Sequence, residues 1–289
     1  MLARAKINLG LNVEPRNRSG FHPLTTIFAE IALADELTVE PASQWRLEMG
    51  GEEALGLSTD DNLIVRAEAM ANLDEHRLGP WRVHLTKHIP VGAGLGGGSS
   101  DAGAWIRFRA ERDPAQSERL WRQAADLGKD IPFFRHGGIQ YASAYGECLR
   151  TLEAPSFQPW VVLAHPGRPL ATATVYQAFD QIVAEGRQSQ QVALAEVEQS
   201  LSRGEIPLDL SNQLERAAMR VDPALVDFHL ALRQASDGEK WWLSGSGATY
   251  YILINDEERA KWLYQSIRRS VDRVWLSRIV PVRSPMERG

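Results

Sequence analysis

A glycine-rich segment in the first half of the chain constrains its fold more than any other feature. Five of the 23 glycines fall within seven positions of Pro90-Val-Gly-Ala-Gly-Leu-Gly-Gly-Gly-Ser-Ser-Asp101. Glycine loses more conformational freedom on folding than other residues, so three in a row are costly unless something must approach the backbone closely. An alternating stretch that runs into Lys87 predicts a strand before the segment, and a helix to about Arg112 should follow it. A glycine loop before a helix N-terminus favours phosphate binding; a flexible loop or tight packing is the alternative.

Two well-known glycine motifs do not account for this segment. Gly92, Gly94 and Gly97 match the dinucleotide pattern G-x-G-x-x-G, but no second strand ending in an acidic residue follows at the expected distance. A Walker A loop is excluded as well, because Gly98 stands where the lysine before Ser99 would be. The feature that both motifs share remains: glycines let the backbone approach an anion, and N–H groups at a helix start bind it.

Without a Walker lysine, the charge of a bound phosphate must be met from elsewhere. Lys6 on the predicted first strand and Lys87 before the glycine segment are the nearest candidates. Ser99 or Ser100 can cap the helix, or turn a hydroxyl towards a Mg²⁺ ion bound to the phosphates. Phosphoryl transfer also needs a carboxylate that orients or deprotonates the acceptor hydroxyl, and Asp130 follows a helix stop before an apolar stretch. Its alternative role is that of a helix-capping or turn aspartate.

The start of the chain predicts a strand with two different faces. Residues 5–13 alternate strictly, with apolar side chains on one face and Lys6, Asn8 and Asn12 on the other. Such a polar face is either exposed to solvent or part of a site. In both cases the alternation places Lys6 beside Asn8.

Composition excludes several classes of protein. The chain has 32 Lys and Arg against 37 Asp and Glu, a net charge of −5, so it has no general electrostatic attraction to nucleic acid or to anionic membranes. Cys148 is the only cysteine, so neither an intrachain disulfide nor a cysteine metal cluster can form. The apolar runs are too short to span a bilayer, and polar residues interrupt any signal-peptide core. A cytoplasmic protein without nucleic-acid or membrane partners is expected.

The order of the predicted elements indicates an α+β fold. Strands dominate the first third of the chain and helices its middle, without regular strand–helix alternation. At roughly 150 residues per domain, 289 residues predict about two domains or lobes, with a boundary near 155–158. Strands are expected near 25–33, 37–40, 45–49, 81–85, 139–144, 160–165, 241–244, 249–255 and 273–282. Helices are expected after an Asp60-Asp61 cap, up to Arg112, over 117–127 and 257–270, and over most of 174–235.

Several segments together resemble one enzyme family, the GHMP-type small-molecule kinases. Residues 90–100 are similar to the nucleotide-binding motif of this family, and Leu243-Ser-Gly-Ser-Gly-Ala248 is similar to its C-terminal glycine motif. Other segments resemble the branch of the family that acts on a cytidine-diphosphate-linked methylerythritol: 5–9, 20–22, 61–66, 128–134 and 165–167. The segments run in the family's order from residue 5 to residue 248, so the resemblance covers most of the chain.

The resemblance implies the GHMP kinase two-lobe fold. An N-terminal lobe, like domain 2 of ribosomal protein S5, would span 1–156 and carry the ATP-binding glycine loop, and a ferredoxin-like C-terminal lobe with extra helices would span 157–289. The implied activity is ATP-dependent phosphorylation of the 2-hydroxyl of the cytidyl substrate, in non-mevalonate isoprenoid precursor biosynthesis. Mg²⁺ would arrive with ATP and contact the protein through Ser100, with no other protein-bound metal. A monomer or weak homodimer is expected.

The resemblance also assigns roles to individual residues. It makes Lys6 and Asp130 the catalytic pair, in which Asp130 accepts the hydroxyl proton and Lys6 offsets negative charge. The ATP-binding residues would be Lys87, Pro90, Val91, Gly92, Ala93, Gly94, Leu95, Gly96, Gly97, Gly98, Ser99 and Ser100. The substrate-binding residues would be Asn8, Phe21, His22, Thr172, Tyr176, Gly245 and Gly247. Among these, the two aromatic rings would hold the cytosine and the histidine would read its edge.

The sequence departs from the family pattern at three places. Phe21 stands where the family usually has tyrosine, which keeps a stacking face but loses a hydroxyl. Lys129 replaces a small residue and puts an extra positive charge beside the catalytic aspartate. Ala171 and Ala173 flank Thr172 where the family often has proline or serine.

Two alternative functions stay open at this point. One is a different acceptor within the superfamily, such as homoserine or mevalonate; Gly20-Phe-His22 argues against it, because a small alcohol needs no flat face and no reader of a base edge. The other is a catalytically silent nucleotide-binding paralogue. The presence of both Lys6 and Asp130 argues against that, because a silent protein does not need the pair.

Overall fold

The structure, a computed structural model, describes residues 1–72, 78–154 and 156–281. Its strands are β1 (Leu2–Val13), β2 (Leu24–Pro41), β3 (Arg46–Gly50), β4 (Trp81–Thr86), β5 (Ile139–Ser143), β6 (Cys148–Thr151), β7 (Trp160–His165), β8 (Trp242–Leu243), β9 (Tyr250–Ile254) and β10 (Arg273–Arg278). Its α-helices are α1 (Leu63–Ala71), α2 (Gly97–Arg112), α3 (Ser117–Leu127), α4 (Thr172–Ala184), α5 (Leu194–Ser202), α6 (Glu215–Val221), α7 (Ala224–Ala235) and α8 (Glu257–Ile267). Short 3₁₀ helices are η1 (Glu52–Ala54), η2 (Pro114–Gln116) and η3 (Ile131–Arg135). No helix in the described ranges is long and apolar enough to cross a membrane.

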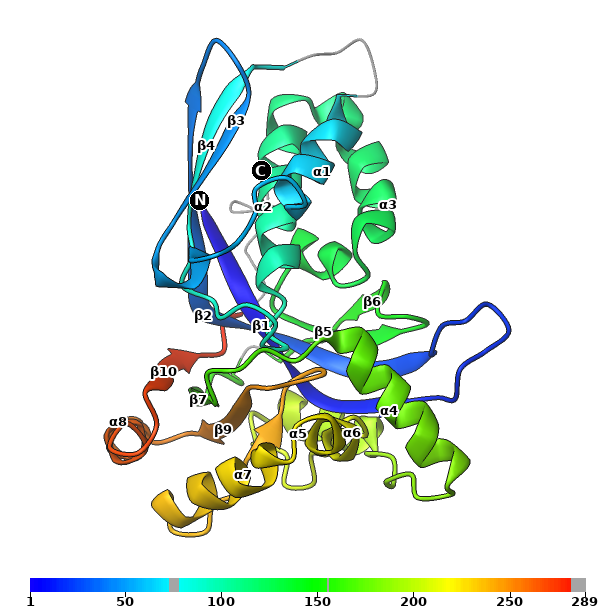
Figure 1. Cartoon of the computed structure of the whole chain (residues 1–289), viewed down its shortest axis with the longest axis vertical. Helices are drawn as coiled ribbons and strands as arrows, with labels where there is room; N and C mark the ends of the chain where they lie inside the picture. Colours follow the sequence, from blue (N-terminus) through cyan, green and yellow to red (C-terminus); the bar gives the residue numbers. More distant parts are fainter. Residues whose placement is uncertain (73–77, 155, 282–289) are drawn as a thin grey trace.

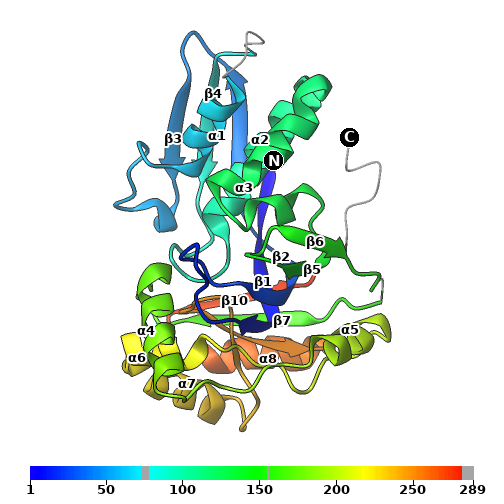
Figure 2. The same cartoon turned by 90° about the vertical axis from the view of Figure 1, so that its right-hand side faces the viewer.

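The molecule contains two sheets, which follow one another along its long axis (Figure 1). The first has the strand order β3-β4-β2-β5-β6, with β1 paired to β2, and α1, α2 and α3 lie beside its upper part. The second has the order β10-β7-β9-β8, with α4 to α8 around it. The turned view in Figure 2 shows the second sheet and its helices below the first. Among the described strands, β3 and β4 are parallel and the other pairs antiparallel.

β1 is buried on both faces. Ile7 and Leu9 are fully buried, and Lys6 and Asn8 on the opposite face are each 4% exposed. Exposure of the polar face to solvent, one of the two interpretations of the sequence, is therefore wrong. Buried polar side chains need internal partners, so this face belongs to an internal site.

β2 runs unbroken through a region where the sequence predicts two strands. Asp35 lies between the two predicted strands, yet it is fully buried. Its carboxylate accepts hydrogen bonds from the backbone N–H groups of His88 and Ile89, at 2.5 and 2.8 Å. A polar residue that is satisfied in this way does not end a strand, and β2 pairs with β1, β4 and β5 along its length.

The start of α1 and the strand β6 also differ from the prediction. The N-cap of α1 is Asn62 rather than the Asp60-Asp61 pair, and its Oδ1 accepts a hydrogen bond from the N–H of Ile64 at 2.9 Å. β6 was not predicted, because its short sequence has no clear alternation. It pairs with β5 at the edge of the first sheet.

One apolar core connects the two sheets. It includes Ile7 and Leu9 of β1, Val161 of β7 and Tyr251 of β9. The boundary predicted between 156 and 157 falls between the last strand of the first sheet and the first strand of the second. Separate lobes on either side of it stay a prediction, because this core draws on both parts.

Candidate active site

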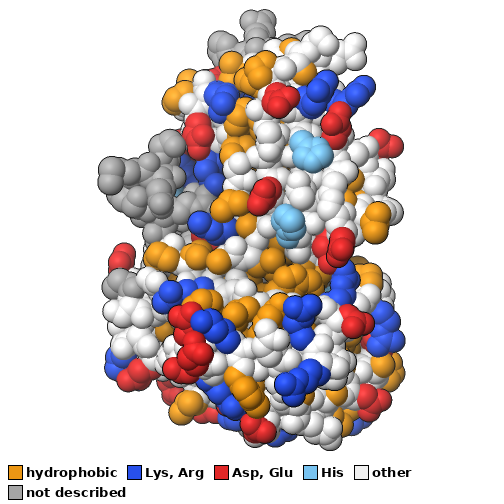
Figure 3. Space-filling view, turned by 90° about the vertical axis from the view of Figure 1, so that its left-hand side faces the viewer, with side chains coloured by type: hydrophobic (Ala, Val, Ile, Leu, Met, Phe, Trp, Pro, Cys, Tyr) orange, Lys and Arg blue, Asp and Glu red, His pale blue; other side chains and the backbone are white. Residues whose placement is uncertain are grey.

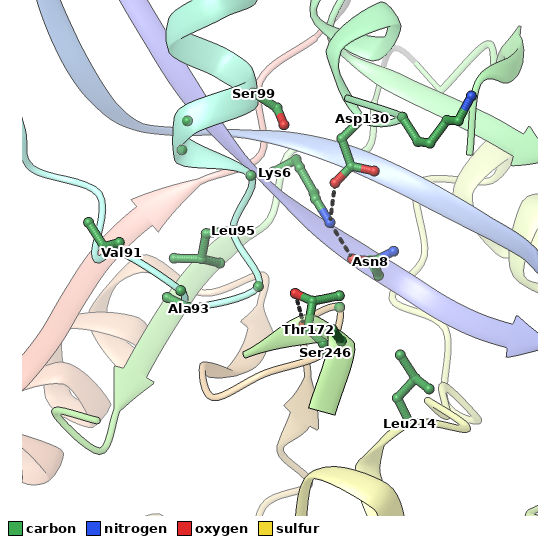
Figure 4. A pocket seen from close by; sticks show the side chains of 18 of the residues that line it. Lys6, Asn8, Val91, Ala93, Leu95, Ser99, Asp130, Thr172, Leu214 and Ser246 are labelled. Atoms are coloured by element: carbon green, nitrogen blue, oxygen red, sulfur yellow. Dashed lines mark hydrogen bonds and ion pairs between the residues drawn. The ribbon is translucent and has the colours of Figure 1, made fainter. Parts of the chain in front are cut away.

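A pocket of about 750 Å³ opens between β1, the glycine segment and α4 (Figure 4). All the residues to which the resemblance assigns a role line it, except Ser100 and Gly247. Side chains predicted from separate segments between Lys6 and Gly245 therefore converge on one cavity. Their individual roles stay predictions, since convergence shows only that they can act together.

The backbone of the glycine segment is held by hydrogen bonds to its carbonyl groups. Four consecutive carbonyl oxygens accept from other segments: Gly92 from the N–H of Leu170, Ala93 from the N–H of Thr249, Gly94 from Oγ of Ser244, and Leu95 from the N–H of Lys6. α2 begins at Gly97, directly after these residues. The N–H groups in the first turn of a helix have no partner within the helix. Beside the pocket they are available to an anion, which the dipole of α2 also attracts.

Two glycines in this segment have backbone conformations that other residues rarely adopt. Gly94 has φ +76°, and a Cβ atom there would lie 2.1 Å from the carbonyl oxygen of Ser244. Gly96 has φ +69° and is the N-cap of α2, without any side-chain capping bond. The predicted capping of this helix by a serine is therefore wrong. Tight packing, the alternative interpretation of the glycines, holds at Gly94 and is compatible with a phosphate site in front of it.

The two serines at the start of α2 have different surroundings. Ser100 is 1% exposed, and its hydroxyl donates a hydrogen bond to the carbonyl oxygen of Arg4 at 2.6 Å. Ser99 lines the pocket, and its side chain points from α2 towards the space in front of Asp130 (Figure 4). Ser99 is thus better placed than Ser100 for a Mg²⁺ ion that arrives with phosphates. Within the described ranges, no group of three or more His, Cys, Asp or Glu side chains could hold a metal ion.

Lys6 and Asp130 meet inside the pocket. Nζ of Lys6 lies 3.3 Å from Oδ2 of Asp130 and donates a hydrogen bond to Oδ1 of Asn8 at 2.8 Å (Figure 4). It also lies 4.9 Å from the ring centre of Phe28. Asn8 in turn donates a hydrogen bond to Oγ1 of Thr26 at 3.0 Å. These contacts fix the amine of Lys6 in one position on β1.

Asp130 reaches the pocket from the turn between α3 and η3. It occupies the N-cap position of η3, but its side chain makes no capping hydrogen bond. The side chain is 33% exposed and faces Lys6, so its alternative role as a helix cap does not describe this carboxylate. An accessible carboxylate beside a fixed ammonium group is suited to take a proton from a hydroxyl.

Lys87 lies under the first turn of α2 and is bonded to two carboxylates. Its amine donates to Asp35, and to Asp101 at 2.7 Å, and it lies 3.5 Å from the position of a Cβ atom on Gly97. Burial alone would lower the pKa of Lys87, but the carboxylates of Asp101 and Asp35 raise it above its ordinary value. Burial raises the pKa of Asp101 to about 8, against the attraction of Lys87. The positive charge of Lys87 is therefore paired with side chains of the protein itself, and its predicted contact with ATP stays a prediction.

Another part of the pocket is lined by rings. Phe21 is 57% exposed, and its ring centre lies 5.5 Å from that of Tyr145. The ring of Tyr176, on α4, lies 5.0 Å from that of His22. Burial, and secondly the negative charge of Asp130, raise the pKa of the Tyr176 phenol well above its ordinary value. The phenol stays neutral, so the pocket offers flat, uncharged surfaces on which a base can stack.

His22 has contacts at both ring nitrogens. Nδ1 lies 3.0 Å from the carbonyl oxygen of Glu14, so this nitrogen carries a proton and donates. Nε2 lies 3.3 Å from Oδ1 of Asp180 without an aligned hydrogen bond. The other carboxylate oxygen of Asp180 lies 3.2 Å from the guanidinium group of Arg16, which lines the pocket. Both ring nitrogens therefore face protein groups, Nδ1 the carbonyl oxygen of Glu14 and Nε2, which is buried, the carboxylate of Asp180.

Sequence reasoning missed Arg16 and Asp180. Asp180 follows Tyr176 by four positions on α4, and this spacing places both on one face of the helix, a signal that could have found it. Arg16 lies in a loop, where no periodic pattern indicates which way a side chain points. Lys129, noted for its extra charge, does line the pocket, and its amine lies 3.6 Å from Glu147.

The loop between β8 and β9 borders the pocket from the second sheet. The hydroxyl groups of Ser246 and Thr172 are hydrogen-bonded at 2.9 Å (Figure 4). Asn212 donates a hydrogen bond to the carbonyl oxygen of Gly245 at 2.7 Å. The Gly-Ser-Gly loop is therefore fixed by side chains from other segments. Gly245 lines the pocket, and Gly247 lies outside its lining.

The chain is similar to known proteins along most of its length. Residues 62–147 match the family described as GHMP kinases N terminal domain. The 4-diphosphocytidyl-2-C-methyl-D-erythritol kinase of Thermus thermophilus is 35% identical over 267 residues, which cover 92% of each chain. The protein of the same name from Streptomyces avermitilis is 32% identical over 272 residues, which cover 92% of this chain and 91% of that one.

Solved structures share the fold. A crystal structure of 4-(cytidine 5'-diphospho)-2C-methyl-D-erythritol kinase matches with a TM-score of 0.79 at 33% identity, over 96% of this chain and 98% of that chain. The mevalonate kinase of L. major matches with a TM-score of 0.69 at 15% identity, a likeness of fold alone. Together they confirm the α+β kinase fold that the sequence predicts.

Proposed function

The chain belongs to the GHMP kinase family and, within it, to the 4-diphosphocytidyl-2-C-methyl-D-erythritol kinases. From this premise we propose that its pocket transfers a phosphoryl group from ATP to the 2-hydroxyl of 4-diphosphocytidyl-2-C-methyl-D-erythritol, a step of isoprenoid precursor formation. One observation carries the proposal: the Lys6–Asp130 pair lines the same pocket as the N-terminal end of α2 and a set of aromatic rings. This combination suits a phosphotransferase with an alcohol acceptor.

ATP would bind with its phosphates at the glycine segment. The first-turn N–H groups of α2 would bind phosphate oxygens, and the glycines allow the positive φ angles and close packing that hold this backbone in place. Ser99 would contact the Mg²⁺ ion that accompanies ATP, and this ion would supply positive charge that offsets the charge of the phosphates. Lys87, with Asp35 and Asp101, would hold the start of α2 against the end of β4.

The reaction would occur between Asp130 and the glycine segment. Asp130 would accept the proton of the 2-hydroxyl as the hydroxyl oxygen bonds to the γ-phosphorus, while the bond from this phosphorus to the β,γ-bridging oxygen breaks and ADP leaves. Lys6 would stabilise the carboxylate and the charge of the transferred group, and Asn8 would hold Lys6 in place. Gly245 would bring its backbone N–H group to the phosphates, whereas the N–H of Gly247 donates to the carbonyl oxygen of Ser244. Phosphoryl transfer demands little covalent chemistry of the protein, so positioning and charge stabilisation supply most of the acceleration.

The cytidyl part of the substrate would occupy the part of the pocket lined by rings. Phe21 and Tyr176 would stack on the cytosine, and His22 would lie at its edge. Arg16 and Thr172 would contact the diphosphate, for which a guanidinium group is a strong partner.

We also expect a cytoplasmic enzyme that acts as a monomer or weak homodimer. Cys148 is exposed and has no disulfide partner, which suits a reducing compartment. Light scattering after gel filtration, at several protein concentrations, measures the oligomeric state.

A coupled assay of ADP release tests the function. The cytidyl substrate would be compared with free methylerythritol phosphate, homoserine and mevalonate. We expect kcat/KM to be at least about 10²-fold higher for the cytidyl substrate, because the smaller acceptors leave buried polar groups of the pocket unpaired. A higher kcat/KM for homoserine or mevalonate would assign a different acceptor. ATP binding without ADP release from any acceptor would favour a catalytically silent protein.

Phe21→Ala is expected to raise KM for the cytidyl substrate about ten-fold and to leave KM for ATP unchanged. Stacking of a base on an aromatic ring is worth roughly 1–3 kcal/mol, whereas Phe21→Tyr keeps the ring face and should be nearly neutral. Steady-state kinetics with each substrate varied in turn measures both constants. Because Phe21 is 57% exposed, its loss should change the melting temperature little. An equal rise in both KM values, or a large fall in melting temperature, would contradict a stacking role.

A further inference from the structure

Glu53 and Arg273 form an ion pair between the two sheets. Glu53 lies in η1, shortly after β3 of the first sheet, and Arg273 is the first residue of β10 in the second. The two residues are 220 positions apart. The side chain of Glu53 is only 11% exposed, and that of Arg273 is 34% exposed. Solvent and salt screen such a pair less than a fully exposed one.

Residues 51–61, which contain Glu53, have few other attachments. Among the described residues, the Glu53–Arg273 pair is the one side-chain ion pair or hydrogen bond that links this segment to a distant one. The other hydrogen bonds recorded for the segment are local turns. Leu55 is 84% exposed and Leu57 is 37% exposed. Gly51 packs closely against the backbone of Lys87, so beyond this residue the position of the segment depends strongly on the pair.

A second cavity, of about 680 Å³, lies behind the segment. Residues 51–53 line it from one side and residues 272–275 from another. Figure 3 shows the face of the molecule on which β10 lies, with apolar side chains and charges of both signs at the waist between its halves. Because a cavity rather than packed side chains lies between the segment and β10, apolar contacts there cannot replace the ion pair.

The same segment forms part of the wall of the first pocket. Leu57 lines that pocket, as do Asn62 and Leu63 directly after the segment. Leu63 Cδ1 lies 3.7 Å from the position of a Cβ atom on Gly98, so this wall adjoins the predicted phosphate site. Under the function proposed above, the phosphates of ATP bind beside this wall, and the rings that would hold the cytidyl base come from other segments, so we expect the wall to receive the nucleoside of ATP.

We propose that the Glu53–Arg273 pair fixes residues 51–61 in the position that receives the nucleoside of ATP, and so sets the affinity for the nucleotide. Neither residue lines the first pocket, so both are positioning residues. A wall that is fixed beforehand needs less ordering when a ligand binds, and this raises affinity. Loss of the pair should therefore weaken nucleotide binding while substrate binding and kcat stay nearly unchanged. The proposal rests on the proposed function only in that the pocket binds ATP.

Glu53→Gln, Arg273→Gln and the double variant test this inference. Calorimetry with a non-hydrolysable ATP analogue gives the nucleotide Kd, and steady-state kinetics gives both KM values and kcat. We expect each single variant to raise Kd and KM for ATP about three- to ten-fold. The Kd of the double variant should be no higher than that of the single variant that binds ATP more weakly, because both substitutions remove the same contact. Arg273 also lies opposite His165 in the ladder between β7 and β10, so Arg273→Gln could disturb that ladder as well as the ion pair. Glu53→Gln removes the ion pair without changing the ladder.

Glu185→Gln and Arg220→Gln provide the matched control. These residues form a two-pronged ion pair between the end of α4 and α6, with distances of 2.8 Å, outside both cavities. Breaking that pair should leave the nucleotide Kd unchanged. Melting temperatures of all variants show whether a change in Kd reflects general loss of folding.

Three results would overturn the inference: an unchanged nucleotide Kd in both single variants, equal rises in the two KM values, or additive effects in the double variant. The proposed function fails separately, if the unmodified enzyme binds the ATP analogue but releases no ADP with the cytidyl substrate. In that case the Kd series still decides the role of the Glu53–Arg273 pair. An unmodified enzyme that binds no ATP analogue would overturn both.

Discussion

Replacing Asp130 by asparagine is expected to lower kcat by about 10²–10⁴-fold, the usual contribution of a positioned general base. The amide keeps the shape of the side chain, but it cannot take the proton of the 2-hydroxyl and places no negative charge beside Lys6. ATP affinity should change little, because the phosphates are expected to bind at the glycine segment. The ADP-release assay measures kcat, and calorimetry with an ATP analogue measures nucleotide affinity.

Asp126→Asn is the matched control for this variant. Asp126 is exposed on α3, four positions before Asp130, and lies outside the lining of the pocket. The same chemical change at this surface position should leave kcat within about two-fold of the unmodified enzyme. Near-normal turnover of Asp130→Asn would show that the carboxylate only positions Lys6 and that the proton leaves by another route.

Part of the candidate active site follows from a local pattern in the sequence. Strict alternation in β1 predicts that Lys6 and Asn8 share a face, and the structure has them hydrogen-bonded at 2.8 Å. The same alternation cannot say whether that face is buried. Burial of that face depends on Phe28, the glycine segment and Asp130, and a period within one strand carries no information about segments further along the chain.

The charge network under α2 could not be predicted for the same reason. Lys87, Asp35 and Asp101 come from three separate segments, and only the tertiary structure brings the amine and the carboxylates together. A lysine before a glycine loop therefore suggests a free cation for phosphate, whereas the folded chain pairs it internally. The Glu53–Arg273 pair is a second instance, since neither residue stands in a motif.

At the start of α2, the preference of serine for the N-cap position is overridden by the turn of the neighbouring chain. Serine is a favoured N-cap, and Ser99 and Ser100 follow the glycines directly. The chain must however turn sharply into the helix, and Gly96 makes this turn at φ +69°. The helix accordingly begins earlier than a serine cap would allow, and both serines lie within its first turns.

Gly94→Ala is expected to lower ATP affinity by about 10²-fold, with a smaller effect on the affinity for the cytidyl substrate. At φ +76° the added Cβ would lie 2.1 Å from the carbonyl oxygen of Ser244, and contacts of Cβ atoms under 3.0 Å essentially never occur. The loop must therefore move by about an ångström, a displacement that can cost about 10²-fold in a site that depends on positioning. The movement would disturb the hydrogen bond from Ser244 Oγ to Gly94 and shift the start of α2 away from Lys6.

Gly186→Ala separates the two consequences of adding a methyl group to a left-handed glycine. Gly186 has φ +66° and nothing within 4 Å of the added Cβ, and it follows α4 outside the pocket. It should therefore lose roughly 1–2 kcal/mol of stability from backbone strain alone and bind the ATP analogue normally. Gly94→Ala should combine a similar or larger loss of stability with the loss of affinity, measured by melting temperature and calorimetry. If Gly94→Ala binds the analogue normally and is destabilised only as much as Gly186→Ala, the carbonyl-bonded glycine backbone does not determine ATP affinity.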